Sequence, residues 1–253
     1  MKPAKRIHAI LTPAELPALR PADLADTLCV VFDVLRATST FVTALQHGAK
    51  KIIPVCEISE ALAERQKDPQ VLLAGERDGV KIGPSLTGGI TFDLGNSPRE
   101  FVPEVVRDRI IISTTTNGTR ALGACRPAQM VLAGAFLNLG ATARFILAQP
   151  AERILLVCAG TGSQTALEDV LGAGALARRL LEQQEFALTD AAALALRAGE
   201  LTGHELVEAL CNTDNGKRLR SQSDLRIDVP FCAQTDVFDL VAGLSDDGLI
   251  WLR

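Results

Sequence analysis

The segment VVFDVLRATST (30–40) places an aspartate and an arginine directly after a run of apolar residues. Apolar β-branched residues that end at Asp33 predict a core strand, and the residues after Arg36 predict a helix. In parallel α/β folds, ligands bind where the carboxyl end of a strand meets the start of a helix. Asp33 is therefore a candidate metal ligand, general base or nucleophile, and Arg36 a candidate clamp for an anion. The sequence is equally compatible with Asp33 as a helix cap and Arg36 on an outer helix face.

Two further segments place polar residues after or near a predicted strand. In GER (75–77), Glu76 and Arg77 follow the apolar run VLLA, and a carboxylate beside an arginine suits a hard cation and a phosphate. Taken alone, an exposed ion pair is the more common explanation of such neighbours. In FDLGNSP (92–98), Asn96 can supply an oxygen to a metal or a cap to a helix, whereas Ser97 is first a helix cap.

The segment STTTNGTR (113–120) lies between a predicted strand and a predicted helix. Consecutive hydroxyl groups, a glycine and the amino end of a helix are typical of an anion cradle. The spacing of a Walker A loop is missing. An Asn-Gly pair is also a common hairpin turn, but the helical pattern that follows favours the cradle. The predicted anion-binding residues are Thr115, Thr116, Asn117, Gly118, Thr119 and Arg120.

A fourth loop, CAGTGSQTALED (158–169), carries a Gly-x-Gly pair that begins at Gly160. The pair matches part of a dinucleotide-binding fingerprint, but the third glycine is missing. Glu168 and Asp169 are adjacent on the predicted helix, so their side chains project about 100° apart and at most one readily faces a given site. The alternative is two solvated acids favoured by the helix dipole.

Taken together, the four loops provide carboxylates, several arginines and hydroxyl- or glycine-rich helix starts, and this combination is a stronger signal than any single loop. Carboxylate oxygens suit Mg²⁺ better than Zn²⁺. A metal beside an anion cradle indicates phosphoryl transfer or hydrolysis, in which catalysis is mainly positioning and charge stabilisation. His47 and His204 are predicted at a helix end and on an exposed helix, so neither is expected to act as a base.

The elements that position these loops alternate between strand and helix for most of the 253 residues. This pattern predicts an α/β fold with three layers, α/β/α, and a largely parallel or mixed sheet. After residue 185 the pattern becomes helical, which predicts a single domain (1–253) with a helical subdomain at 186–222. The predicted strands cover 27–33, 49–55, 70–76, 108–113, 129–136 and 153–160, with two short pieces around Asp236, and the predicted helices include 38–48, 59–67, 97–106 and 137–149.

Composition excludes several classes of function. A net charge of −4, nine Phe, one Trp and no Tyr argue against nucleic-acid binding. The six cysteines form no CxxC pair and mostly lie in apolar runs, which indicates free thiols in a reducing compartment. The sequence shows neither a signal peptide nor a run of apolar residues long enough to span a membrane. We therefore expect a soluble, cytoplasmic protein that binds neither nucleic acid nor membrane.

Five blocks in this order resemble the 2-phosphosulfolactate phosphatase family: VVFDVLRATST, GER, FDLGNSP, TTTNGTRAL, and CAG followed by ED and GAG. A looser match of Asp, Cys, Gln and Asp ends at Asp236, so the resemblance spans roughly residues 28–240. The resemblance implies an α/β fold unlike that of haloacid-dehalogenase phosphatases. It also implies Mg²⁺-dependent hydrolysis of (R)-2-phospho-3-sulfolactate to 3-sulfolactate and phosphate, on the route to coenzyme M.

The resemblance also suggests roles for the candidate residues. In this hypothesis Mg²⁺ is held by Asp33, Glu76 and either Asp169 or Glu168. The anionic substrate is bound by Arg36, Arg77, Asn96, Thr115, Thr116, Asn117, Gly118, Thr119, Arg120 and Gly160. Water is the preferred nucleophile, because the position two residues after Asp33 is Leu35, where haloacid dehalogenases carry a second aspartate. A phosphorylated Asp33 is the alternative.

Three other functions stay open at this stage. The substrate could be another small phosphorylated 2-hydroxy acid, the CAGTGS loop could serve a nucleotide-dependent enzyme, or the protein could bind anionic metabolites without turnover. The expected partner in each phosphatase case is a small anionic phosphorylated molecule, and a homodimer is the base-rate expectation for a soluble enzyme.

Overall fold

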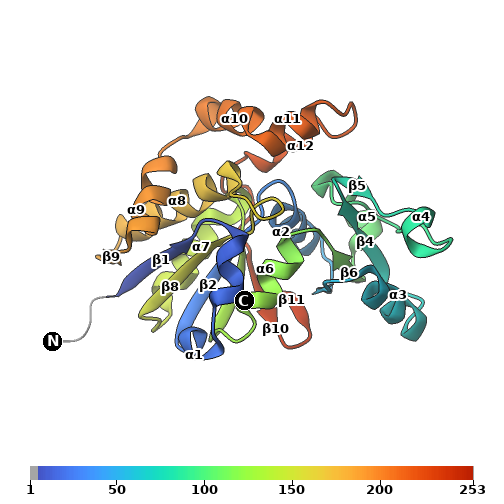
Figure 1. Ribbon diagram of the computed structural model, residues 1–253, viewed down its shortest axis with the longest axis horizontal. Helices are drawn as coiled ribbons and strands as arrows, with labels where there is room; N and C mark the ends of the chain where they lie inside the picture. The colour runs from blue at the N-terminus through green and yellow to red at the C-terminus, as the bar shows by residue number, and fades with distance from the viewer. Residues whose placement is uncertain (1–4, 253) are drawn as a thin grey trace.

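The computed structural model describes residues 5–252, which form one mixed sheet with helices on both faces (Figure 1). The strands within these residues are β1 (Arg6–Ile10), β2 (Thr27–Phe32), β3 (Lys51–Pro54), β4 (Leu72–Arg77), β5 (Val80–Lys81), β6 (Ile110–Thr114), β7 (Met130–Gly134), β8 (Arg153–Cys158), β9 (Ala187–Leu188), β10 (Val241–Ser245) and β11 (Gly248–Leu252). The sheet order is β5-β4-β6-β3-β11-β10-β7-β2-β8-β1-β9. The predicted α/β class with a largely parallel or mixed sheet is confirmed.

The helices connect and cover these strands. They are α1 (Pro21–Leu24), α2 (Ala37–Gln46), α3 (Ile58–Lys67), α4 (Pro84–Thr87), α5 (Pro103–Val106), α6 (Gly118–Cys125), α7 (Leu139–Ala148), α8 (Leu167–Leu181), α9 (Asp190–Ala198), α10 (Gly203–Asn212), α11 (Asp214–Arg220) and α12 (Asp228–Cys232). Short 3-10 turns occur at Pro13–Ala18, Pro98–Glu100 and Phe136–Asn138.

The sheet consists of two parallel halves joined by an antiparallel hairpin. One half contains β7, β2, β8, β1 and β9, and the other contains β3, β6 and β4. The hairpin β10–β11 lies between them. Strand β10 pairs antiparallel with β7, and β11 pairs antiparallel with β3. Three consecutive antiparallel pairings reverse the strand direction from one half to the other. In a flat sheet, the carboxyl ends of the two halves would therefore lie at opposite edges.

The sheet is not flat, because it bends around two helices. Helix α2 packs against β7, β10, β11 and β3, and α6 packs against β2, β3 and β7. Figure 1 shows α2 and α6 between the two halves of the sheet. Twist accumulates from strand to strand, so it turns the two halves toward each other. The loops after β2 and β8 consequently lie beside the loops after β4 and β6.

The side chains of β2 explain why this strand is central. All six residues of β2 are buried, and successive side chains enter the cores on the two faces of the sheet. Val30 and Phe32 pack with α7 and α8, whereas Cys29 and Val31 pack with α2 and α6. A strand that is covered on both faces is apolar throughout, which is the pattern that the sequence shows.

Helix α2 is buried although it is rich in hydroxyl groups. Its Ser39 and Thr43 hydroxyls donate to backbone carbonyls, those of Val34 (2.8 Å) and Ser39 (2.7 Å) respectively. The Thr40 hydroxyl donates to the Asn96 carbonyl at 2.9 Å. Because each of these hydroxyl groups has a hydrogen-bond partner, α2 can be buried between the two halves of the bent sheet without the cost of an unpaired polar group.

Several predicted boundaries are wrong. The predicted helix at 97–106 is a 3-10 turn followed by α5, because Pro103 starts a new helix and interrupts the earlier one. In the C-terminal region a helix, α12, precedes Asp236, and both strands follow that residue. Strand β1 has no predicted counterpart, although its first four residues alternate between exposed and buried.

The helical stretch after residue 185 packs against helix α8 and strand β1 through α9. Ala192, Leu206 and Leu219 belong to the same hydrophobic cluster as Phe32 of β2. A separate helical subdomain at 186–222 stays a prediction. Among residues 5–252, no helix is both long enough and apolar enough to cross a membrane.

Candidate functional site

A cavity of about 240 Å³ lies where the carboxyl ends of β2, β4, β6 and β8 converge beneath α11. It is lined by Asp33, Leu35, Arg36, Glu76, Asp78, Gly79, Asn96, Thr116, Asn117, Gly160, Thr161, Gly162, Asn215 and Arg218. Seven of the predicted site residues are among them: Asp33, Arg36, Glu76, Asn96, Thr116, Asn117 and Gly160. The volume is below that of sites for drug-sized ligands, so the cavity suits a small molecule.

Asp33 lies at the end of β2 and faces the cavity. Within residues 5–252 its carboxylate accepts one hydrogen bond, from the Ala37 N–H at 3.2 Å, so one oxygen remains for a ligand. Burial, with a smaller contribution from the Glu76 and Glu168 carboxylates, raises the pKa of Asp33 to about 7. A carboxylate with a raised pKa and a single hydrogen bond is typical of a functional site. The sequence left open whether Asp33 is a helix cap or a ligand. Asp33 can be both, because one oxygen accepts from the first N–H of α2 and the other remains for a ligand.

Glu76 joins two loops at the cavity wall. Its Oε1 accepts from the N–H and hydroxyl of Thr116 at 2.9 and 3.0 Å, and its Oε2 accepts from the Gly79 N–H at 2.6 Å. Asp78 and Gly79 both have positive φ and form the two-residue turn between β4 and β5. Glu76 is therefore held in a fixed orientation beside Asp33 by backbone groups from two directions.

Arg36 is a buried arginine whose charge is balanced by Asp228 of α12. Its Nη1 donates to Asp228 Oδ2 at 2.8 Å and its Nη2 donates to the Gly79 carbonyl at 2.9 Å. The Ser97 hydroxyl donates to the other oxygen of Asp228 at 2.7 Å. Both side chains of the ion pair are almost inaccessible to solvent, at 3% and 0% exposure. Arg36 thus lines the cavity in a fixed position, and its peptide bond with Leu35 is cis.

Asp169 and Glu168 diverge, as adjacent residues on a helix must. Asp169 accepts from the Val34 N–H at 2.8 Å and from the Gly160 N–H at 2.9 Å, which ties the loops after β2 and β8 together. Burial raises the pKa of Asp169 well above its usual value, and the Asp33 and Glu168 carboxylates add to the effect. Burial also raises the pKa of Glu168, partly offset by a hydrogen bond from Asn215. Neither acid lines the cavity, although Glu168 lines an adjoining one.

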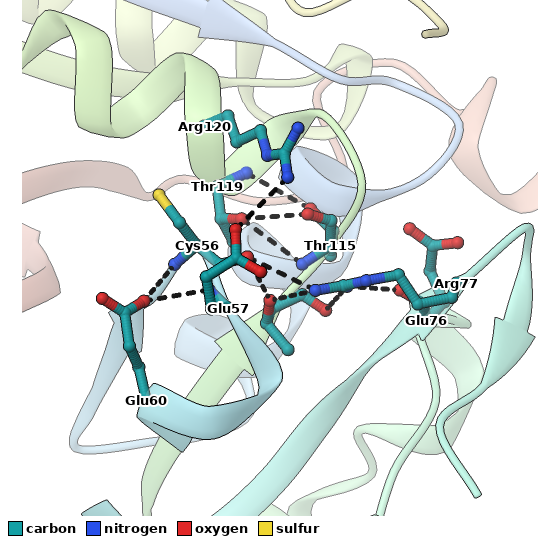
Figure 2. A network of polar contacts seen from close by, with 9 residues as sticks. Cys56, Glu57, Glu60, Glu76, Arg77, Thr115, Thr119 and Arg120 are labelled. Carbon is teal, nitrogen blue, oxygen red and sulfur yellow. Dashed lines mark hydrogen bonds and ion pairs between the residues drawn. The ribbon is translucent and has the colours of Figure 1, made fainter. Parts of the chain in front are cut away.

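Glu76 and Arg77 do not share a ligand, because neighbouring residues of a strand point to opposite faces. Figure 2 shows the Arg77 guanidinium directed away from the Glu76 carboxylate. Arg77 Nη2 donates to Thr114 Oγ1 at 3.0 Å and to the Cys56 carbonyl at 3.3 Å. Arg77 therefore joins β4 to the chain after β3 and lies outside the cavity.

The predicted anion cradle at 115–119 is only partly available to a ligand. Thr115 and Thr119 bond to each other, with the Thr119 N–H donating to Thr115 Oγ1 at 3.2 Å and the Thr119 hydroxyl donating to the Thr115 carbonyl at 3.1 Å (Figure 2). Gly118 packs against Asp33 and Ala37 so closely that a Cβ at this position would lie 2.6 Å from each of them. Thr116 and Asn117 are the members of this segment that line the cavity.

Arg120 points away from the cavity. Its guanidinium is 60% exposed and lies 3.4 Å from a Glu57 carboxylate oxygen, as Figure 2 shows. Arg120 is the third residue of α6, so its side chain leaves the helix on the side opposite the Gly118 face that contacts Asp33. The structure therefore separates Arg120 from the other candidate residues.

Several cavity residues were not predicted. Asp78 and Gly79 form an Asp-Gly turn, a sequence signal for a tight hairpin that was available but unused. Thr161 and Gly162 belong to the fourth loop but were not selected individually. Asn215 and Arg218 come from α11, whose sequence DNGKRLR has no feature that distinguishes a site from an exposed helix.

The cavity offers oxygen ligands that fit a hard cation, although they do not form a dense cluster. No group of three or more His, Cys, Asp or Glu side chains within residues 5–252 is arranged to hold a metal ion. Mg²⁺ commonly binds one or two carboxylates and completes its shell with water and phosphate oxygens. Asp33 and Glu76 are two such carboxylates in one cavity. The lining carries the carboxylates of Asp33, Glu76 and Asp78, whereas Asp228 neutralises Arg36 and leaves Arg218 as the available positive charge, so a bound cation would favour an anionic ligand.

A larger cavity, of about 670 Å³, lies at the opposite ends of β1, β2 and β8 and is lined in part by Arg6, Thr27 and Arg153. It contains none of the predicted site residues. Ligands in open α/β sheets bind at the carboxyl ends of strands, which favours the smaller cavity as the functional site.

Comparison with known proteins identifies one family. Residues 11–247 match the family model described as 2-phosphosulpholactate phosphatase. Three similar proteins are each named "Probable 2-phosphosulfolactate phosphatase". The protein from Caldanaerobacter subterraneus subsp. tengcongensis is 38% identical over 90% of this chain and 92% of its own length. Those from Thermotoga petrophila and Deinococcus radiodurans are 42% and 41% identical over 85% and 86% of this chain and 88% and 87% of their own lengths.

Family match, pairwise similarity and fold thus agree over nearly the whole length of the chain. The chain belongs to the 2-phosphosulfolactate phosphatase family.

Proposed function

We propose that this protein is a Mg²⁺-dependent phosphatase that hydrolyses (R)-2-phospho-3-sulfolactate to 3-sulfolactate and phosphate. As a member of its family, the chain is a phosphoric monoester hydrolase. The observation that carries the proposal is the convergence of Asp33, Glu76 and Arg36 in one small cavity at the strand ends. The reaction would take place on the route to coenzyme M, in a cytoplasmic enzyme.

The carboxylates of Asp33 and Glu76 would hold Mg²⁺, and the cation would neutralise charge on the phosphoryl group. Support comes from the raised pKa of Asp33, which reflects burial and then repulsion from Glu76 and Glu168. A cation between Asp33 and Glu76 would relieve that repulsion. Asp169 fits a different role, since its two oxygens accept backbone hydrogen bonds and hold the loops in register.

Substrate would be bound by polar groups that are already fixed in the cavity wall. Asn96 is 6% exposed and lines the cavity. Its side-chain amide would donate hydrogen bonds to a bound anion. Arg36, oriented by Asp228 and Gly79, lines the same space. Thr116, Asn117 and Gly160 would complete the wall.

Water would be the nucleophile. Its oxygen would bond to phosphorus as the bond from phosphorus to the 2-oxygen of the substrate breaks, and a proton would pass to the departing hydroxyl. Asp33 as nucleophile is the alternative, because its free oxygen faces the cavity. Acid quenching of a single turnover with ³²P-labelled substrate distinguishes them. Absence of ³²P from the protein at every time point supports water, whereas ³²P bound to Asp33 overturns it.

A nucleotide-dependent enzyme is less compatible with the fourth loop. In dinucleotide sites the pyrophosphate lies on the N–H groups that follow the strand. Here the Gly160 N–H is donated to the Asp169 carboxylate at 2.9 Å, which places a negative charge at that position. Thermal-shift titration with NAD and ATP provides the check, since a large shift with either would favour the nucleotide enzyme.

The decisive experiment is phosphate release from 2-phospho-3-sulfolactate, 2-phospholactate and phosphoglycolate, each with Mg²⁺ and with EDTA. Mg²⁺-dependent release that favours the sulfonated substrate supports the proposal. Release from the other acids alone keeps the phosphatase and changes its substrate. Binding of the acids without release from any of them would support the binding-module alternative. A homodimer also stays a proposal, which sedimentation would test.

A further inference from the structure

Helix α11 contributes two side chains to the cavity, Asn215 and Arg218, although it lies far along the chain from the strand-end loops. In Figure 1 the segment α10–α12 extends above the site, across the strand ends. Asn215 is 7% exposed, whereas Arg218 lies at the open side of the cavity. The helix therefore forms the wall opposite the carboxylates of Asp33 and Glu76.

Arg218 is the cavity arginine whose charge remains available to a ligand. Arg36 is paired with Asp228 at 2.8 Å and is buried. For Arg218, the described part of the chain provides no carboxylate within ion-pair distance, and its one recorded hydrogen bond goes to an amide oxygen. Four of the five N–H donors of a guanidinium group therefore remain for other partners.

Asn215 fixes the position of Arg218. The Asn215 amide nitrogen donates to Thr161 Oγ1 at 2.7 Å and to a Glu168 carboxylate oxygen, which leaves the amide oxygen directed at Arg218. Arg218 Nη2 donates to that oxygen at 2.9 Å. The guanidinium carbon also lies 3.9 Å from the position of a Cβ on Gly79, on the far side of the cavity. Asn215 thus holds the guanidinium beside Gly79 at the opening of the cavity, where Arg218 is exposed to solvent.

These contacts place two guanidinium groups on either side of Gly79, one neutralised and one available. Arg36 donates to the Gly79 carbonyl, and Arg218 approaches the Cα side of the same residue. A substrate with its phosphoryl group between Asp33, Glu76 and Arg36 would extend its remaining anionic groups toward α11. A planar guanidinium binds a sulfonate or carboxylate through paired N–H donors.

We propose that Arg218, oriented by Asn215, binds the sulfonate of the substrate and determines specificity for sulfonated over unsulfonated phospho-acids. This inference rests on the function proposed above. Arg218 would act on substrate binding, and Asn215 would be a positioning residue. Because the sulfonate is distant from the phosphorus, loss of the contact would raise KM and change kcat little.

The test compares the unmodified protein with Arg218→Gln on 2-phospho-3-sulfolactate and on 2-phospholactate, which lacks the sulfonate. We expect KM for the sulfonated substrate to rise roughly 10- to 100-fold, since a charge-assisted hydrogen bond is lost. KM for 2-phospholactate should change less than about threefold, so the ratio of kcat/KM between the substrates should collapse. Arg220→Gln, two residues along the same helix and outside the cavity lining, is the matched control and should leave both constants unchanged.

Arg218→Lys adds a second readout. It keeps the charge but removes the planar donor pair, so it should recover part of the lost discrimination. Equal losses on both substrates would overturn the inference, since Arg218 would then serve the phosphoryl group or the fold. Unchanged discrimination in Arg218→Gln would also overturn it. If the unmodified protein releases phosphate from neither substrate, the proposed function fails instead, and that result is separate from any variant.

Discussion

Replacing Asp33 with asparagine should abolish phosphatase activity and at the same time stabilise the metal-free protein at alkaline pH. The side chains are isosteric, and the asparagine oxygen can still accept the hydrogen bond from the Ala37 N–H. What changes is the charge. Burial and neighbouring carboxylates raise the pKa of Asp33 to about 7, so ionised Asp33 opposes folding.

The magnitude and sign follow from that pKa. In the unfolded chain Asp33 loses its proton near pH 4, whereas in the folded protein it keeps the proton until about pH 7. The proton therefore stabilises the fold at low pH, and this contribution is lost as the pH rises from about 4 to about 7. A rise of about three pKa units corresponds to about 4 kcal/mol as an upper limit. Because Asp33 is partly exposed and shares its titration with other acids, we expect roughly 1–2 kcal/mol.

The assay is urea unfolding at pH 5 and pH 8 in EDTA, for the unmodified protein and Asp33→Asn. The free energy of unfolding of the variant should exceed that of the unmodified protein at pH 8, and the difference should shrink at pH 5. Added Mg²⁺ should stabilise the unmodified protein and leave the variant unaffected. A variant that is equally destabilised at both pH values would refute the reasoning, because Asp33 would then be a structural cap alone.

Three other substitutions test the roles of individual contacts. Asp228→Asn should cost about 3–5 kcal/mol in urea unfolding, because it leaves the buried Arg36 guanidinium unpaired, and a loss below about 1 kcal/mol would contradict this. Gly118→Ala should lower kcat/KM at least about tenfold, since the new methyl group would lie 2.6 Å from an Asp33 carboxylate oxygen and displace it. Arg120→Ala should change kcat/KM less than about twofold in steady-state assays, because this side chain is 60% exposed and outside the cavity. A tenfold loss of kcat/KM would contradict this and indicate that Arg120 contributes to catalysis or substrate binding.

The local sequence around β2 predicted much of the site for a clear physical reason. A strand that is covered on both faces is apolar throughout, so the first polar residue after it, Asp33, marks its carboxyl end. The same argument located Glu76 near the end of β4, Thr116 after β6 and Gly160 after β8. In parallel segments these loops are where ligands bind, so the residue types alone selected most of the cavity's carboxylates and hydroxyls.

The direction of individual side chains was not available from the sequence. Arg77 and Arg120 have the right chemistry and lie within three residues of cavity residues in the chain, yet both point elsewhere. Strand alternation turns Arg77 to the opposite face from Glu76, and the helical position of Arg120 turns it to solvent. Arg218, in contrast, lines the cavity but was not predicted, because the sequence of a polar helix does not indicate that the helix lies over a site.

The sequence by itself determined the elements, the buried strands and the loops that end in polar residues, because these depend on local periodicity. Only the tertiary structure decided that the loops after β2 and β8 meet those after β4 and β6. The hairpin β10–β11 reverses the strand direction between the two halves, and a flat sheet would separate these ends. The bend of the sheet around α2 and α6 brings them together, and such a bend depends on packing between segments far apart in the chain.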